Sequence, residues 1–319
     1  MSLLGAMEAG GTKFVCAASK RGEILAQTRI PTRGPDATLA AARQFFAAVT
    51  AEHGELSALG IAAFGPLELR NSSPTYGRLL GTPKQGWAGT DLVAPFAHRF
   101  GCPVVIDTDV NASALAETLH GAARGYRSAV YVTVGTGIGG GAVVDGRTLR
   151  GSPHPEMGHI RVTRHERDTG FAGVCPFHGD CLEGVASGPA IVARYGAPLD
   201  ALPTDHEAIA VVGHYLGQLA ANVLLMIAPE RVILGGGVMS SEPLLRETRA
   251  AAARLLNGYG GYGGSAASLE QTIVAPGLGE RSGIVGALVL AERALQAPAD
   301  DGRQTAIGTS DRHAASAPE

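Results

Sequence analysis

The sequence predicts an α/β protein made of two similarly organised blocks. Strand-like and helix-like patterns alternate along most of its 319 residues. A strand–glycine–strand pattern occurs twice, at residues 3–19 and 129–144, and each copy opens its own block. The length predicts about two domains of roughly 150 residues each. With 45% hydrophobic residues, such a chain can bury a full core.

The first block begins with a predicted hairpin. Two strands, at residues 3–8 and 13–19, flank the Gly10-Gly11 pair, which suits a tight turn. The remaining elements follow from apolar periodicity and from turn residues. They are a strand at 24–30, a helix at 36–53, a strand at 59–64, a helix at 91–99, a strand at 104–106 and a helix at 112–119.

The second block repeats the strand–glycine–strand pattern. Apolar strands at 129–134 and 142–144 enclose the glycine-dense residues 135–141. A long helix is predicted at 207–228, a strand at 231–234 that closes on Gly235-Gly236-Gly237, and a last helix at 282–295. Residues 296–319 are rich in Ala, Pro, Asp and Ser, so we expect a disordered tail.

Composition excludes several classes of protein. Glycine makes up 45 of 319 residues, about twice its usual share, but without the three-residue period of collagen. The net charge is −3, and the sequence lacks the basic stripe that is typical of nucleic-acid binders. The most apolar stretch, at 208–227, is interrupted by polar residues, so no membrane span is expected. The N-terminus lacks a basic region followed by a long apolar run, so no signal peptide is expected. We therefore expect a cytoplasmic protein.

Two glycine clusters suit phosphate. Gly10 and Gly11 are followed by Thr12 and Lys13, a set that offers backbone N–H groups, a hydroxyl and a positive charge, although a plain hairpin turn is an equal alternative. Residues 135–141 hold five glycines, a density that favours a phosphate-cradling hairpin. The Gly-x-Gly-x-x-Gly spacing there does not indicate NAD, because a strand and not a helix follows it.

Asp109 lies where a strand is expected to end and a helix to begin. A carboxylate at such a junction can accept a hydroxyl proton during phosphoryl transfer. Without further context, an ordinary N-cap is the simpler interpretation of an acidic residue at this place.

A metal site is predicted from the C-x-x-H-x-x-C spacing of Cys175, His178 and Cys181. Sulfur and imidazole ligands this close together suit tetrahedral zinc. A closed site needs a fourth ligand, for which His159 and His154 are the candidates. Near this cluster, Glu156, His159 and Glu183 offer groups that can bind several hydroxyls at once, as a sugar requires.

Taken in order, the motifs resemble the ROK family of sugar kinases, within the actin/hexokinase-like ATPase superfamily, over about residues 7–295. The first phosphate loop, with Glu8 where most relatives have Asp, looks like that of the fructokinase branch. The other matching motifs are Phe64-Gly65-Pro66-Leu67, residues 81–87, Gly135-Thr136-Gly137 with Gly139-Gly140, Gly235-Gly236-Gly237-Val238, and Glu156-x-Gly-His159 with the Cys/His cluster.

The resemblance implies roles for these residues. Asp109 matches the catalytic base, and Gly65, Pro66, Thr108, Glu156, His159 and Glu183 match sugar contacts, with Thr108 where the family usually has Asn. ATP contacts are implied for Gly10, Gly11, Thr12, Lys13, Gly135, Thr136, Gly137, Gly139, Gly140, Gly235, Gly236 and Gly237. The implied zinc ligands are His159, Cys175, His178 and Cys181, which leaves out His154.

The implied fold is two actin-like ATPase (ribonuclease H-like) α/β domains with a cleft between them. The expected division is a small domain at 1–113, completed by the helix at 282–295, and a large domain at 114–281 with the zinc loop. The resemblance further implies ATP with Mg²⁺ and a hexose as partners, a structural Zn²⁺, and a homodimer, since members of the family are often dimers.

The function expected from the resemblance is an ATP-dependent hexose kinase, with fructose as the favoured substrate. Glucokinase or mannokinase is the alternative within the family. A sugar-responsive repressor would carry a helix-turn-helix before the first phosphate loop, and only six residues precede Met7. A non-catalytic sugar-sensing protein is the third alternative, against which Asp109 and the three glycine loops count.

Overall fold

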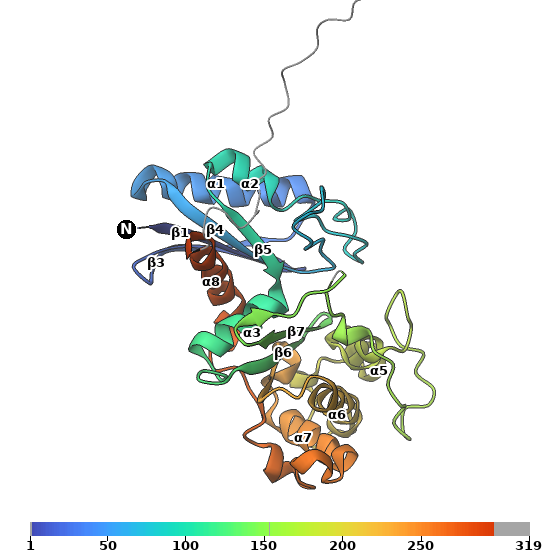
Figure 1. The fold of residues 1–319 in the computed structure, drawn as a ribbon. Coiled ribbons are helices and arrows are strands. Elements are labelled where there is room, and N and C mark those ends of the chain that lie inside the picture. The colour runs from blue at the N-terminus through green and yellow to red at the C-terminus, as the bar shows by residue number, and fades with distance from the viewer. Residues whose placement is uncertain (1, 153, 297–319) are drawn as a thin grey trace, which may run out of the picture.

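The computed structural model describes residues 2–152 and 154–296 and confirms an α/β fold with two five-stranded sheets (Figure 1). The first sheet has the order β3-β2-β1-β4-β5, with β1 (Leu3–Ala9), β2 (Lys13–Lys20), β3 (Glu23–Pro31), β4 (Leu56–Ala63) and β5 (Val104–Thr108). The second has the order β10-β9-β6-β7-β8, with β6 (Ser128–Val134), β7 (Ile138–Val144), β8 (Arg147–Thr148), β9 (Arg231–Gly235) and β10 (Ile273–Val274).

The two sheets share one pairing scheme. An antiparallel hairpin, β1–β2 in the first and β6–β7 in the second, continues into parallel strands, β4 and β5 or β9 and β10. Parallel strands bring their carboxyl ends to the same edge of a sheet. In the first sheet that edge gathers Glu8, the Gly65-Pro66 turn after β4, and Asp109 after β5.

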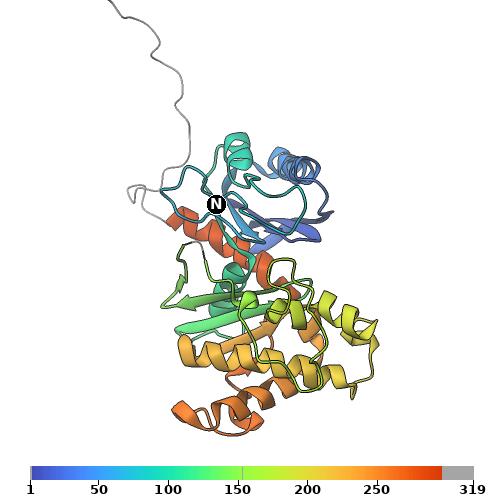
Figure 2. The same ribbon diagram turned by 90° about the vertical axis from the view of Figure 1, so that its right-hand side faces the viewer.

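Helices separate and cover the sheets in layers (Figures 1 and 2). α1 (Pro35–His53) and α2 (Ala94–Phe100) cover one face of the first sheet. On its other face, α8 (Ser282–Gln296) packs against β1, β4 and α3 (Asp109–His120), and α3 in turn packs on β6 and β7. The far side of the second sheet carries the short α4 (Leu182–Ala186) and α5 (Gly188–Tyr195), then α6 (Glu207–Met226) and α7 (Glu242–Leu256).

Glycines bring the central layer together. A Cβ on Gly60 of β4 would lie 1.9 Å from the carbonyl oxygen of Ala287 in α8, and one on Gly286 would lie 2.2 Å from that of Ala112 in α3. Because only glycine leaves room for such contacts, α8 can lie directly on the strand on one side and on α3 on the other. The last helix of the chain is thereby fixed beside the first sheet.

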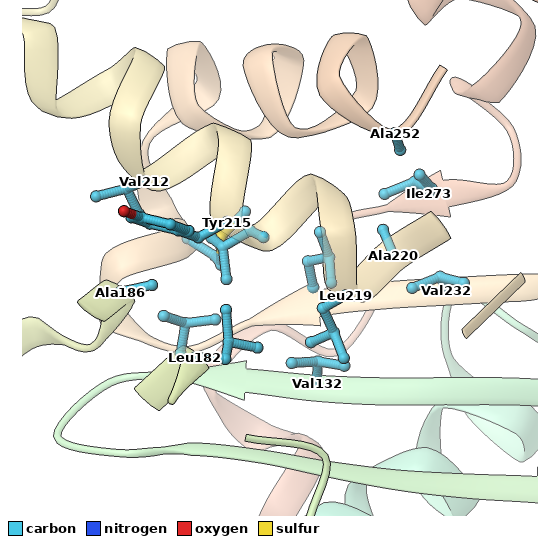
Figure 3. Close-up of a cluster of buried hydrophobic side chains, with 14 of the residues drawn as sticks. Val132, Leu182, Ala186, Val212, Tyr215, Leu219, Ala220, Val232, Ala252 and Ile273 are labelled. Carbon is cyan, nitrogen blue, oxygen red and sulfur yellow. The ribbon is translucent and has the colours of Figure 1, made fainter. Parts of the chain in front are cut away.

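The core of the second half forms around α6. Val212, Tyr215 and Leu219 of this helix are buried against Leu182 of α4 and Val132 of β6 (Figure 3). Among the described residues, α6 is the helix that is long and apolar enough to cross a membrane by length and composition, yet 61% of its most apolar window is buried inside the protein. Its apolar character is that of a core helix.

Several predicted boundaries are wrong, among them the start of β4, which lies at Leu56 and not at residue 59. The helix expected at 91–99 begins at Ala94, because Asp91 Oδ1 accepts hydrogen bonds from the N–H groups of Val93 and Ala94 in the preceding bend. The helix expected at 112–119 begins at Asp109, with Thr108 as its N-cap. The glycine segment at 135–141 is a loop only up to Gly137, since β7 begins at Ile138.

The glycines inside β7 make room for packing. A Cβ on Gly141 would lie 2.4 Å from the backbone of Val110 and Asn111 in α3, and one on Gly140 would lie 2.5 Å from Met157 Sδ. Of the predicted tail, Gln296 is the last residue of α8, and 297–319 lie outside the described residues. The boundaries of the two domains stay a prediction.

Candidate active site and metal centre

A cavity of about 400 Å³ is lined by residues from both halves of the chain. Glu8 of β1 and Asp109 of α3 face it from one side. The Gly235-Gly236-Gly237 turn after β9 faces it from the other, together with Met239 and Leu245. Gly236 has a φ of +90°, and a Cβ there would lie 2.4 Å from the carbonyl oxygen of Val134, so this turn needs glycine. The cavity combines two carboxylates, exposed backbone and an apolar wall.

Burial shapes the charges of the two carboxylates. It raises the pKa of Glu8 to about 7, and the charge of Asp109 adds to that rise. Burial also raises the pKa of Asp109 to about 6, against the hydrogen bond that Asp109 Oδ1 accepts from Val110 N at 2.9 Å, and the charge of Glu156 adds to the rise. Asp109 thus interacts with a carboxylate on either side. A positive charge bound near these carboxyl groups would favour their ionised forms.

Gly65, His154 and Glu156 lie close together where the sugar is predicted to bind. A Cβ on Gly65 would lie 3.1 Å from the His154 ring and 3.6 Å from Glu156 Oε1. Although the Glu156 side chain is 40% exposed, packing around its carboxylate raises its pKa to about 7, and the charge of Glu183 contributes. Glu183 Oε2 accepts a hydrogen bond from Ile138 N at 2.8 Å. The Glu156 carboxylate therefore lies beside Gly65 and close enough to Glu183 for their charges to interact.

The predicted sugar contact at Thr108 is placed differently from its neighbours. Its side chain is 3% exposed, and its hydroxyl accepts the hydrogen bond of Asn111 N as the N-cap of α3. Asp107, just before it, is fully buried and accepts hydrogen bonds from Arg150 Nη2 at 2.7 Å and Thr148 Oγ1 at 2.9 Å. These residues build the junction that presents Asp109.

Apart from Glu8, the residues of the two predicted phosphate loops lie outside the lining of this cavity. The Gly10-Gly11-Thr12-Lys13 turn closes with a hydrogen bond from Gly10 N to Lys13 O, and Gly11 O accepts one from Lys84 Nζ at 2.6 Å. In the second loop Thr136 is exposed, Gly137 lies against Glu183, and Gly139 and Gly140 belong to β7. Of the three glycine clusters predicted to bind ATP, only Gly235-Gly236-Gly237 lines the cavity together with Asp109.

The four predicted zinc ligands form one cluster. Atoms of His159, Cys175, His178 and Cys181 that can bind a metal all lie within 4.8 Å of one another. His159 Nδ1 is 3.5 Å from Cys181 Sγ and 3.7 Å from Cys175 Sγ, and His178 Nδ1 is also 3.7 Å from Cys175 Sγ. A tetrahedral zinc with ordinary bond lengths sets sulfur and nitrogen ligands about 3.6 Å apart. This donor set fits Zn²⁺ in both chemistry and spacing.

Backbone geometry shapes this loop around the cluster. Cys175 N and O form a reciprocal pair of hydrogen bonds with Gly179, which has a φ of +63° and closes the turn that carries His178. Cys181 then begins α4 as its N-cap, and Glu183 follows in the first turn of that helix. A metal here would order the loop that supports Glu183.

Sequence reasoning missed two features of the site. Glu8 was noted only as a departure from the wider family, although it lines the cavity, and an acidic residue at the end of a strand beside a glycine turn is a signal for it. His154 was considered only as a zinc ligand, whereas the structure places it beside Gly65, away from the metal cluster. No sequence spacing connects it with that turn.

The two matched sheets with a cavity between them define an α/β protein of the actin-like ATPase class, as solved structures show. A ROK hexokinase from Thermus thermophilus has a TM-score of 0.73 at 26% identity, covering 92% of this chain and 99% of that one. A ROK glucokinase from Streptomyces griseus, solved with glucose and AMPPNP, has a TM-score of 0.69 at 26% identity, covering 92% and 100%.

The sequence model of the ROK family matches residues 4–294. The chain therefore belongs to the ROK family. Among curated proteins, it is 45% identical to a fructokinase from Zymomonas mobilis over 91% of this chain and 96% of that protein. It is 38% identical to a fructokinase from Pediococcus pentosaceus, over 92% and 99%.

Proposed function

We propose that this protein is an ATP-dependent fructokinase that transfers the γ-phosphoryl group of ATP to D-fructose and gives D-fructose 6-phosphate and ADP. The observation that carries the proposal is the position of Asp109. Its carboxylate faces the cavity beside Gly235-Gly236-Gly237 and also interacts with Glu156 at the Gly65 end of the site. A base placed between a nucleotide and a sugar is what phosphoryl transfer to a hydroxyl requires.

In this mechanism Asp109 accepts the proton of the attacking fructose hydroxyl. The hydroxyl oxygen forms a bond to the γ-phosphorus while the bond to the β,γ-bridging oxygen breaks, and ADP carries away that electron pair. Backbone N–H groups of the Gly235-Gly236-Gly237 turn orient the nucleotide. The hairpin turns at Gly10 and Gly135 are proposed to approach the phosphates when the two halves of the chain close on the substrates.

The sugar end follows from the converging carboxylates. Glu156 and Glu183 accept hydrogen bonds from fructose hydroxyls, and His159 offers the ring nitrogen that the metal cluster leaves free. Thr108 contributes through the junction it caps, and Gly65-Pro66 forms the wall opposite. Together, these contacts hold one fructose hydroxyl within reach of Asp109.

Two metals belong to the proposal. Glu8, whose carboxylate faces the cavity, would be an oxygen ligand for Mg²⁺ next to the ATP phosphates, and the ion would neutralise charge on the transferred group. His159, Cys175, His178 and Cys181 would hold a structural Zn²⁺, which would order the loop before α4. A cytoplasmic homodimer is the form that the family resemblance favours, and size-exclusion chromatography with light scattering measures the assembly.

Fructose is favoured over glucose by the comparisons. Relatives named fructokinase are 37–45% identical to this chain, whereas relatives named glucokinase are 27–30% identical. A coupled ADP-release assay across fructose, glucose, mannose and N-acetylated hexosamines tests the proposal. The highest kcat/KM is expected with fructose. A higher value with another hexose would reassign the substrate, and no ADP release with any sugar would indicate a sugar-binding protein without kinase activity.

A further inference from the structure

His154 connects the two halves of the chain at the sugar end of the site. It follows β8 in the second half, and its side chain is only 5% exposed. Its Nε2 accepts a hydrogen bond from Leu67 N at 3.0 Å, and Leu67 belongs to the first half, just after β4. The metal cluster does not use this histidine, and neither does the phosphoryl transfer described above.

The segment that His154 contacts is rigid on its opposite side. Leu67 pairs with Leu79 in an antiparallel bridge, and Pro66 O accepts a hydrogen bond from Leu80 N at 2.7 Å. Leu67 itself is fully buried. Its N–H group therefore faces His154 as an interior donor, and the imidazole is the acceptor that satisfies it.

Glu156 lies on the same imidazole. Its Oε1 is 3.6 Å from His154 Nδ1, and both side chains flank the position of a Cβ on Gly65. The ring thus contacts the Gly65-Pro66-Leu67 turn with one nitrogen and approaches the Glu156 carboxylate with the other. A substitution at His154 changes the relative position of two groups that we assign to the sugar.

We propose that His154 is a positioning residue that fixes the Gly65-Pro66-Leu67 turn against Glu156 and so sets the sugar end of the cleft for fructose. The inference depends on the proposed function. It assigns His154 no contact with the substrate. Its contribution is to hold Gly65 and Glu156 at the spacing that a bound hexose needs, before the sugar arrives.

The bond requires a neutral imidazole with its proton on Nδ1. The Nδ1–H group donates a hydrogen bond to Pro155 O at 3.3 Å, and Nε2 is then free to accept one from Leu67 N. Burial lowers the pKa of His154, which favours this neutral form. A second link between the halves, the ion pair of Asp107 and Arg150, holds the preceding residues on the end of β5.

The decisive variants keep or remove the acceptor. His154→Phe retains a ring but offers no acceptor to Leu67 N, whereas the side-chain oxygen of His154→Gln can take the place of Nε2. The matched control is His98→Phe, the same change at an exposed position of α2. For each purified variant, initial rates give KM for fructose, KM for ATP and kcat, and thermal unfolding and zinc content are measured on the same sample.

We expect His154→Phe to raise the KM for fructose by about tenfold or more, since a buried donor without its partner shifts an equilibrium by that order. The KM for ATP should stay within about twofold of the parent, because the nucleotide end is not attached to His154. His154→Gln should recover most of the affinity for fructose, and His98→Phe should match the parent.

An unchanged KM for fructose in folded His154→Phe would overturn the proposal, as would a His154→Gln variant no better than His154→Phe. If His154→Phe does not fold, His154→Asn replaces it, because its shorter amide cannot reach Leu67 N and the same rise in KM is expected. Absence of fructose phosphorylation by the parent protein would instead refute the proposed function, so the two failures are distinguishable.

Discussion

Glu8, near the end of β1, and Asp109, the first residue of α3, line one cavity, and the charge of Asp109 is the second cause, after burial, of a Glu8 pKa of about 7. The two residues are 101 positions apart in the sequence, at the carboxyl ends of β1 and β5. Two partly buried carboxylates that repel each other are an unfavourable arrangement in an empty site. This arrangement fits the proposed roles of Asp109 as a proton acceptor and of Glu8 as a carboxylate that would hold a cation beside the phosphates.

Asp109→Asn should lower kcat for fructose by at least about a hundredfold, the usual size of a lost general base. The amide keeps the size of the side chain and can still accept the hydrogen bond of Val110 N. Steady-state kinetics on a variant with parental thermal stability checks this. A kcat equal to that of the parent would exclude Asp109 as the base.

The pH dependence of kcat/KM should show an acid limb near pH 6. The carboxylate form of Asp109 is the active base, and burial raises its pKa to about 6, so protonation below that pH removes the base. Activity should fall about tenfold for each pH unit below the limb. In Asp109→Asn the residual rate should lack the limb assigned to Asp109, and a limb that persists would point to another group.

Glu8→Gln should stabilise the protein without nucleotide and Mg²⁺ at pH 8, by about 1–3 kcal/mol. The folded-state pKa of about 7 exceeds the ordinary value of 4.5, so the folded protein holds this proton more tightly than the unfolded chain. The contribution of Glu8 to the free energy of unfolding is therefore greatest below pH 4.5 and declines as the pH rises to about 7. Urea unfolding of both proteins at pH 5 and pH 8 measures the effect, and a gain that is not larger at pH 8 would contradict it.

Cys181→Ala should lose zinc and destabilise the loop before α4. Cys181 is fully buried and both histidine and cysteine partners lie within bonding geometry of one ion, so one missing ligand opens the site. Metal analysis of the purified parent should find about one zinc per chain. Cys102→Ala, a buried thiol outside the cluster, is the control. A parent protein free of zinc would refute the assignment.

Glu117→Gln should destabilise the fold by about 2–4 kcal/mol. The Glu117 carboxylate is fully buried in α3 and accepts four hydrogen bonds, from Ala122 N, Gly277 N, Leu278 N and Ser282 Oγ. An amide turns one acceptor into a donor that faces other donors. Urea unfolding measures the loss, and Glu270→Gln, at an exposed position, should be near neutral.

The sequence predicted elements whose signals are local. The hairpin of β1 and β2 could be predicted because Gly10-Gly11 lies between two apolar strands, and the zinc cluster because three of its ligands lie within seven residues. Helix α7 (Glu242–Leu256) is long but was missed, because no element was predicted between the Gly235-Gly236-Gly237 turn and the helix at 282–295. Local patterns say where an element can form, and say little about its partners.

Glycine shows where this limit lies. The excess of glycine predicted backbone approaches, and the Gly235-Gly236-Gly237 turn does line the cavity. Other glycines serve packing: Gly60 and Gly286 admit α8, and Gly141 admits α3. The glycine-rich residues 258–264 form a turn from which the Tyr262 hydroxyl donates a hydrogen bond to Leu224 O near the end of α6. Which backbone a glycine meets depends on elements far away in the chain.

The sequence by itself determined the repeated α/β pattern, the place of Asp109 at a strand–helix junction, and the spacing of Cys175, His178 and Cys181 as candidate metal ligands. Tertiary structure alone decided that Glu8 and Asp109 line one cavity and that the Thr108 hydroxyl caps α3. It also decided that His154 accepts a hydrogen bond from Leu67 N. The physical reason is that composition and spacing act over a few residues, whereas burial, pKa and hydrogen-bond partners are set by side chains that only the packed fold brings within reach.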